Sequence, residues 1–215
     1  PNGNGGIFAA LNNESIVTSM REAGIKYVHV CSVDNILFKM GDPLFLGLFI
    51  DKNLELACKS VERENPGESV GVFCLKNGKL SVAEYSEIGA EQAALVNNGD
   101  GRLLYNQANI ISYLFKLDFL ETICQKSNDI LYPHAAFKKV SFFDFEQKMV
   151  VKPTTPNAYK MELFLFDAFC LASNYCIVEV KKEDEFAPLK NSSHSSIDNP
   201  ECARIKLQNL HLNYL

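Results

Sequence analysis

Apolar and polar positions follow two different periods along the first fifty residues. Residues 7–23 carry apolar side chains at close to helical spacing, and Gly24 ends the pattern, so we predict a helix there. The next residues, 25–30, are rich in β-branched and aromatic side chains, as strands are. Residues 43–50 begin at a proline and are again predicted to be helical. The chain therefore starts with a loop, a helix, a strand and a second helix.

Two pairs of strand-like segments are each separated by turn residues. Residues 70–75 and 79–85 flank Asn77-Gly78, a dipeptide strongly favoured in two-residue hairpin turns. Residues 138–145 and 149–151 predict a second, peripheral hairpin. Hairpin strands run antiparallel, whereas strands connected through a helix can run parallel, so the predicted sheet is mixed.

The C-terminal half alternates between helical and strand patterns. Residues 87–95 and 111–125 are predicted helices, and the strongly apolar residues 160–172 predict a helix that leads into a strand at 176–180. A further helix is predicted to start at Asn199, because a cap residue, a proline and an acid follow one another there. This alternation indicates one α/β domain with a mixed sheet flanked by helices.

Composition and charge narrow the class of protein. The chain has 215 residues, of which 47% are apolar and 22% charged, which is enough for a globular domain with a sizeable core. No run reaches the roughly 18 apolar residues of a membrane span. The net charge of -5 argues against a nucleic-acid polymer as partner, since phosphate-backbone binding needs clustered Lys and Arg. We therefore expect no membrane or nucleic-acid partner.

Cysteine and histidine usage argues against disulfides and zinc. The seven cysteines form no C-x-x-C pair, and several lie in apolar runs such as Phe169-Cys170-Leu171, which predicts reduced core thiols and a cytoplasmic location. The four histidines show no metal-ligand spacing with cysteines or acids, so we expect no structural zinc site. His29 lies within a strand pattern and is expected to be a core or face residue rather than a base.

Two loops have the composition of a phosphate or nucleotide site. Residues 1–6 are rich in Gly and Asn and precede a helix, which lets the backbone approach a ligand closely, although most such turns are structural. Asp34 follows a strand, where open α/β sheets bind ligands and where one or two carboxylates with substrate phosphates typically hold Mg²⁺. The alternative for Asp34 is a turn residue that caps the next segment.

Three further segments offer polar groups to a sugar phosphate. Glu84 ends a strand, and its carboxylate can accept hydrogen bonds from sugar hydroxyls, although an exposed edge charge explains it equally well. Residues 99–106, followed by Asn109, combine turn residues with amides suited to an acetamido sugar. Lys190 follows a loop stiffened by Pro188 and offers a point charge for phosphate. Most single lysines are merely solvated, so spacing alone does not select this one.

Taken in order, six motifs resemble those of the eukaryotic UDP-N-acetylglucosamine pyrophosphorylases over essentially the whole chain. The opening PNGNGG is similar to that family's P-x-G-N-G-G segment, whereas UDP-glucose pyrophosphorylases usually show P-P-G-H-G-D, so Asn4 and Gly6 favour the N-acetylhexosamine branch. Asn2 and Ala108 depart from the family's usual residues at positions that we do not expect to be indispensable. The other five motifs are VDNIL (33–37), VAEYSEI (82–88), DGRLLYNQANI (100–110), KMELFLFDAF (160–169) and EDEFAPLKN (183–191).

The resemblance implies a Rossmann-like (GT-A-like) nucleotidyltransferase fold and a reaction. UTP and N-acetylglucosamine 1-phosphate would give UDP-N-acetylglucosamine and pyrophosphate, with Mg²⁺ as cofactor. Gly3 and Asn4 would line the uridine and sugar side, and the catalytic residues would be Asp34, which holds Mg²⁺, and Lys190, which contacts the α-phosphate. Periodicity alone would place Phe164 and Phe166 in the core of an apolar helix. The implied sugar contacts are Gly71, Glu84, Asn109, Phe164 and Phe166.

The resemblance also implies that parts of the family's sequence lie outside the chain. The L-x-G-G-x-G-T-R-L-G loop, which cradles the nucleoside triphosphate, would lie before Pro1, and a C-terminal domain would follow. Both ends therefore look like cuts, and residues 1–215 correspond to the sugar-binding portion of the central domain. Two alternatives stay open: a sugar-nucleotide-binding fragment without turnover of its own, or the same chemistry with the 1-phosphate of glucose or N-acetylgalactosamine.

Overall fold

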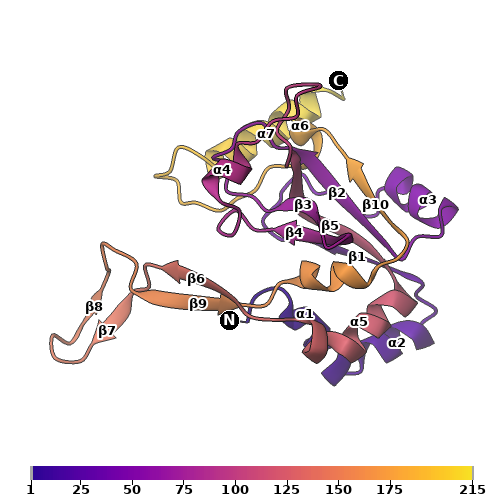
Figure 1. Cartoon of the computed structure of the whole chain (residues 1–215), viewed down its shortest axis with the longest axis horizontal. Helices are drawn as coiled ribbons and strands as arrows, with labels where there is room; N and C mark the ends of the chain where they lie inside the picture. The colour runs from indigo at the N-terminus through magenta and orange to yellow at the C-terminus, as the bar shows by residue number, and fades with distance from the viewer. Residues whose placement is uncertain (1, 215) are drawn as a thin grey trace.

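The computed structural model describes residues 2–214 and is built on a six-stranded sheet with helices on both sides (Figure 1). Pro1 of the opening motif and Leu215 lie outside the described residues. Among the helices that the structure describes, none has the length and apolar character needed to cross a membrane. The predicted α/β class is confirmed. The strands of the sheet are β1 (Tyr27–Cys31), β2 (Leu56–Glu62), β3 (Val72–Lys76), β4 (Lys79–Ala83), β5 (Gln107–Lys116) and β10 (Tyr175–Glu179).

The central strand is β5, which pairs with three neighbours. β2 runs antiparallel along one edge of β5, while β1 and β3 pair antiparallel with the two halves of its other edge. β3 and β4 form the predicted hairpin, in which Asn77 and Gly78 have positive φ angles of 53° and 74°, as this type of turn requires. β10 adds to β2 in the parallel direction, so the sheet is mixed, as predicted.

Helices cover both faces of the sheet. They are α1 (Gly6–Asn13), α2 (Ile16–Glu22), α3 (Pro43–Asp51), α4 (Ala90–Ala93), α5 (Leu117–Ile130), α6 (Lys182–Glu185), α7 (Pro200–Leu212) and a 3-10 helix, η1 (Leu165–Leu171). The largest core cluster joins the sheet to α1, α5 and η1, and a second cluster joins the opposite face to α3. Alternate residues of β5 supply the two clusters: Tyr113 and Phe115 the first, Leu114 the second.

A two-stranded arm projects from this body (Figure 1). At its base, β6 (His134–Lys138) pairs antiparallel with β9 (Ala158–Glu162). Farther out, β7 (Phe142–Asp144) pairs with β8 (Met149–Val151), which confirms the predicted peripheral hairpin. Because β9 returns directly into η1, the base of the arm lies against the body.

Two predicted helices are shorter or interrupted in the structure. The helix predicted over residues 7–23 is divided into α1 and α2 at Ser15, whose φ of 54° is left-handed and cannot continue a helix. The helix predicted over 87–95 is reduced to α4, because the N–H groups of Glu87 and Ile88 both turn back to the carbonyl of Glu84. The predicted helix starts at Pro43 and after Asn199 are confirmed.

Two other helix predictions are wrong in their first parts. Residues 111–116 of the helix predicted over 111–125 belong to β5, and α5 begins only at Leu117. Since β5 is covered on both faces, it lacks the alternation by which a strand is recognised. The helix predicted over 160–172 starts as strand β9, which ends at Glu162, and continues as the 3-10 helix η1.

All seven cysteines are free, as predicted, but they are not all in the core. Cys58 and Cys124 are buried, whereas Cys31 is exposed at the end of β1. His29 is a half-buried residue on the face of β1, where its Nε2 lies 3.1 Å from the Ser112 hydroxyl, which confirms its structural interpretation.

Candidate functional site

The loop after β1 and the segment after α6 lie side by side. The N–H of Leu189 donates to the carbonyl of Asp34 (2.9 Å), and Asn35 forms an isolated antiparallel bridge with Pro188. These contacts join parts of the chain that are about 150 residues apart. They place Lys190 beside Asp34, which brings the two predicted catalytic residues together.

The side chain of Asn35 locks the two segments to each other. Its Nδ2 donates to the carbonyl of Glu185 (2.8 Å), and its Oδ1 accepts from the N–H groups of Ala187 (2.9 Å) and Leu37 (3.3 Å). Asn35 is buried, so all three bonds are shielded from water. Asn35 belongs to the same sequence motif as Asp34, but its hydrogen-bond partners could be identified only from the folded structure.

The carboxylate of Asp34 is half-buried and accepts a hydrogen bond from the Ser32 hydroxyl. Within residues 2–214, no group of three or more His, Cys, Asp or Glu side chains is placed to hold a metal ion. One carboxylate fits Mg²⁺ when substrate phosphates supply further ligands, which is a common arrangement for this ion. The exposed Lys190 next to it is suited to the same phosphates.

Gly71, Glu84 and Asn109 form a second group. The N–H of Asn109 donates to the carbonyl of Gly71 (2.8 Å), and a Cβ on Gly71 would lie only 2.9 Å from Glu84 Oε1. Asn109 Oδ1 accepts from the Tyr113 hydroxyl (2.7 Å) and from the N–H of Ile111 (3.1 Å). The three predicted sugar contacts, which lie just after β4, in β5 and just before β3, are therefore adjacent and tightly packed.

A strained backbone position lies next to this group. Ile111 has a φ of 54°, which is left-handed and rare for a β-branched residue. It falls where the pairing of β5 with β2 shifts register, between Cys58 and Ser60. The bulge turns the carbonyl of Ile111 toward the N–H of Ser32 (3.0 Å) and its own N–H toward Asn109. Strain of this kind is concentrated at functional sites.

The pKa of Glu84 is raised above its usual range. Burial is the main cause, and the negative charge of Glu87 adds to it, while the positive charges of His134, Lys190 and Lys138 act in the opposite direction. Lys190, one of the two predicted catalytic residues, is therefore among the charges that act on Glu84, a predicted sugar contact.

Phe164 and Phe166 stack on each other at the start of η1, with ring centroids 4.9 Å apart and planes 20° apart. Phe164 is half-buried and lines a cavity of about 140 Å³ that Glu84 also lines, at the base of the arm. Phe166 is buried behind it, 3% exposed. Of the five predicted sugar contacts, Glu84 and Phe164 line this cavity, whereas Gly71, Asn109 and Phe166 do not.

The N-terminal loop docks against the chain just before η1. The N–H of Gly5 donates to the carbonyl of Leu163 (2.9 Å), and Gly3 has a φ of 73° at a position where a Cβ would collide with the same carbonyl. Asn4 Oδ1 accepts from the N–H of Leu165 (2.8 Å), so this oxygen is used by the fold. Gly3 and Asn4 thus lie beside the two stacked phenylalanines.

His134 belongs to the site although its sequence context gives no sign of this. Its Nδ1 lies 2.5 Å from Glu87 and its Nε2 3.0 Å from Asp167, and its ring is 4.7 Å from that of Phe164. Burial alone would lower the pKa of His134, but the two carboxylates outweigh burial and hold the pKa above its usual value. The partners are 47 and 33 residues away, so no local spacing signals the cluster.

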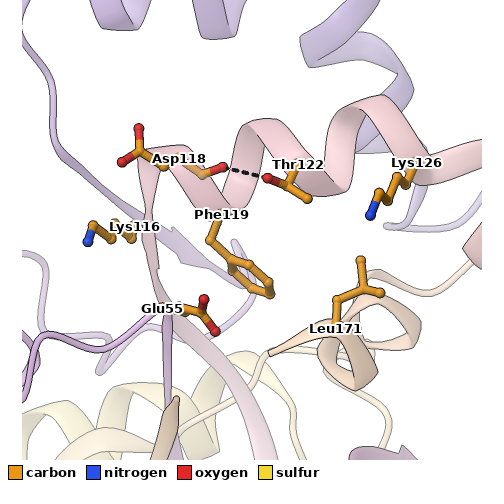
Figure 2. Close-up of a pocket in the computed structure, with 7 residues that line it drawn as sticks. All are labelled: Glu55, Lys116, Asp118, Phe119, Thr122, Lys126 and Leu171. Carbon is orange, nitrogen blue, oxygen red and sulfur yellow. Dashed lines mark hydrogen bonds between the residues drawn. The ribbon is translucent and has the colours of Figure 1, made fainter. Parts of the chain in front are cut away.

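A larger cavity of about 270 Å³ lies away from these residues, at the start of α5 (Figure 2). Its Glu55 carboxylate already accepts from the N–H of Ser173 (2.8 Å), and its Thr122 hydroxyl donates to the carbonyl of Asp118 (2.9 Å). None of the predicted site residues lines it, so it is separate from the candidate site. The lining residues are Glu55, Lys116, Asp118, Phe119, Thr122, Lys126 and Leu171.

Comparison with known proteins identifies close relatives. The chain is 43% identical over 211 residues to the human UDP-N-acetylhexosamine pyrophosphorylase-like protein 1, covering 98% of the chain and 41% of the relative. It is 40% identical over 222 residues to UDP-N-acetylglucosamine diphosphorylase 1 of Arabidopsis thaliana, covering 100% of the chain and 41% of the relative. The chain thus spans about 40% of the length of these curated relatives.

A solved structure and a family profile agree with these relatives. The uridine diphosphate N-acetylglucosamine pyrophosphorylase of Trypanosoma brucei, in complex with an inhibitor, superposes with a TM-score of 0.85 at 31% identity, covering 100% of this chain and 43% of that one. The nucleotidyltransferase fold implied by the sequence motifs is therefore confirmed. The family profile described as UTP–glucose-1-phosphate uridylyltransferase matches residues 1–213, and the chain belongs to that family.

Proposed function

We propose that the protein carrying this chain transfers a uridylyl group from UTP to N-acetylglucosamine 1-phosphate. The names of its relatives support this reaction. The observation that carries the proposal is the pairing of the Asp34 segment with the Lys190 segment. This pairing supports a site in which a carboxylate would hold a metal and a nearby cation would bind phosphate.

The reaction needs positioning and charge stabilisation rather than a general base. An anionic oxygen of the sugar phosphate attacks the α-phosphorus of UTP, one O–P bond forms, and the bond to the bridging oxygen breaks and releases pyrophosphate. Because the attacking oxygen is already ionised at neutral pH, no proton has to be removed. Lys190 would bind the α-phosphate, while Glu84 and Asn109 would orient the sugar.

Mg²⁺ is proposed as the cofactor, with Asp34 as the residue of this chain that would hold it. The ion would supply positive charge next to the phosphates. The Ser32 hydroxyl, which donates to the Asp34 carboxylate, would orient that carboxylate.

We also propose the cytoplasm as the compartment, and UTP, N-acetylglucosamine 1-phosphate, UDP-N-acetylglucosamine and pyrophosphate as the small-molecule partners, with no nucleic-acid polymer and no membrane. Seven free cysteines support a reducing compartment. The net charge of -5 supports the absence of a nucleic-acid polymer.

The first experiment is pyrophosphate-dependent breakdown of UDP-N-acetylglucosamine with Mg²⁺, run beside UDP-glucose and UDP-N-acetylgalactosamine. Turnover that favours an acetylated sugar supports the proposal, and the two acetylated substrates together decide between the hexosamines. The assay should be made both on this chain and on the longest natural form of the protein. Binding of the nucleotide sugar by this chain without turnover would favour the alternative of a sugar-nucleotide-binding fragment.

Substitution of Lys190 tests its assigned role. Lys190→Ala should lower turnover by about two orders of magnitude or more, because a cation opposite the phosphates is lost. Lys181→Ala, which removes an exposed lysine nine residues earlier, is the matched control and should leave turnover unchanged. An unchanged rate in folded Lys190→Ala would refute the role.

A further inference from the structure

Lys59 is a buried cation in the middle of β2. Its side chain is 1% exposed, and its Nζ lies 2.5 Å from Asp42 and 2.6 Å from Glu185. The ring of Phe45 lies beneath it, 5.1 Å from Nζ to the centroid. Burying an ammonium is costly unless it is paired, and buried ion pairs often add little net stability over an apolar replacement. Stability alone is therefore a weak explanation for this lysine.

The two carboxylates that bind Lys59 belong to the two segments that carry Asp34 and Lys190. Asp42 ends the loop that carries Asp34, and it caps α3 by accepting from the N–H of Leu44 (3.0 Å). Glu185 ends α6, five residues before Lys190, and its carbonyl accepts from Asn35 in the Asp34 loop (2.8 Å). The ammonium of Lys59, a residue of β2, thus connects both the Asp34 loop and the segment before Lys190 to the central sheet.

We propose that Lys59 is a positioning residue for uridylyl transfer. Through Asp42 and Glu185 it fixes the distance between Asp34 and Lys190, without touching the substrates itself. This inference rests on the proposed function. The group formed by Gly71, Glu84 and Asn109 is held by hydrogen bonds of its own, so sugar binding should not depend on Lys59.

The test is Lys59→Met in the longest natural form of the protein, with kcat and the KM for N-acetylglucosamine 1-phosphate measured separately. We expect kcat to fall about 10- to 100-fold, since misplacing catalytic groups by about 1 Å has effects of this size, while the KM changes less than about threefold. The matched control is Arg63→Met, which removes another buried cation near the end of the same strand. Arg63 is 3% exposed and is bonded to main-chain carbonyls, not to the two loops.

A second variant separates positioning from stability. In Lys59→Met the buried carboxylate of Glu185 keeps only the longer ion pair with Lys39, 3.6 Å away. Lys59→Met/Glu185→Gln neutralises that carboxylate, so the melting temperature should rise above that of Lys59→Met while kcat stays low. Recovery of kcat together with stability would overturn the inference, as would an equal fall in kcat in folded Arg63→Met. Absence of turnover in the wild-type protein would instead refute the proposed function, which keeps the two failures distinct.

Discussion

Adding one methyl group at Gly71 should impair sugar binding and also lower the stability of the fold. A Cβ at Gly71 would lie 2.9 Å from Glu84 Oε1 and 2.9 Å from Val82 Cγ1. Val82 is 4% exposed and belongs to the β3–β4 hairpin, where it is paired with Phe73. The carboxylate of Glu84 is the end of a flexible side chain and moves readily, whereas the overlap with the buried Val82 must be relieved by a shift of the hairpin and lowers stability.

The size of the effect follows from these distances. Ordinary contacts between carbon atoms are about 3.5–4.0 Å, so the carboxylate of Glu84 must move by roughly 0.5–1 Å. Overpacking of this kind costs about 1–3 kcal/mol of stability. A displaced carboxylate also loses a hydrogen bond to a sugar hydroxyl, worth about 1.5–3 kcal/mol. Because about 1.4 kcal/mol corresponds to a factor of ten, affinity for UDP-N-acetylglucosamine should fall about 10- to 100-fold.

Isothermal calorimetry of wild type and Gly71→Ala with UDP-N-acetylglucosamine measures this change, and thermal unfolding reports the stability. Gly67→Ala is the matched control, because it lies in the same loop and its Cβ would meet no atom within 4 Å. The control should bind as the wild type does. Binding of Gly71→Ala within twofold of wild type would refute the packing argument and the place of Glu84 in the sugar site.

Two further predictions concern the neighbours of the stacked phenylalanines. Asn4→Ala removes the acceptor for the N–H of Leu165 and should lower the free energy of unfolding by about 1 kcal/mol, or the melting temperature by about 2–4 °C. Asn4→Asp keeps the acceptor and should melt as the wild type does. Equal melting temperatures of Asn4→Ala and wild type would contradict this prediction. Because the pKa of His134 is raised in the folded state, its bonds to Glu87 and Asp167 contribute fully to the free energy of unfolding below the unfolded-state pKa of about 6.5. This contribution to stability is lost as the pH rises through the folded-state pKa. Urea unfolding between about pH 6 and 8 should therefore show a fall in stability with pH that His134→Gln lacks; equal slopes would disprove it.

The sequence by itself determined the features that depend on neighbouring residues. The hairpin at Asn77-Gly78 was predictable because few residues other than Gly and Asn adopt positive φ readily. The starts of α3 and α7 were predictable because a cap side chain and a proline act within one turn. The order of the six motifs was likewise sufficient to indicate the resemblance to UDP-N-acetylglucosamine pyrophosphorylases, and the named relatives together with the profile match confirm it.

Features that depend on distant contacts were decided only by the tertiary structure. β5 looks helical in sequence because packing on both of its faces removes the polar alternation of a strand. Nothing near Lys59 in the sequence shows that it is buried between carboxylates 17 residues before and 126 residues after it. The pairing of the Asp34 and Lys190 segments likewise joins residues that are far apart in the sequence. Periodicity and propensity act over a few residues, whereas burial and charge pairing depend on which segments the folded sheet brings together.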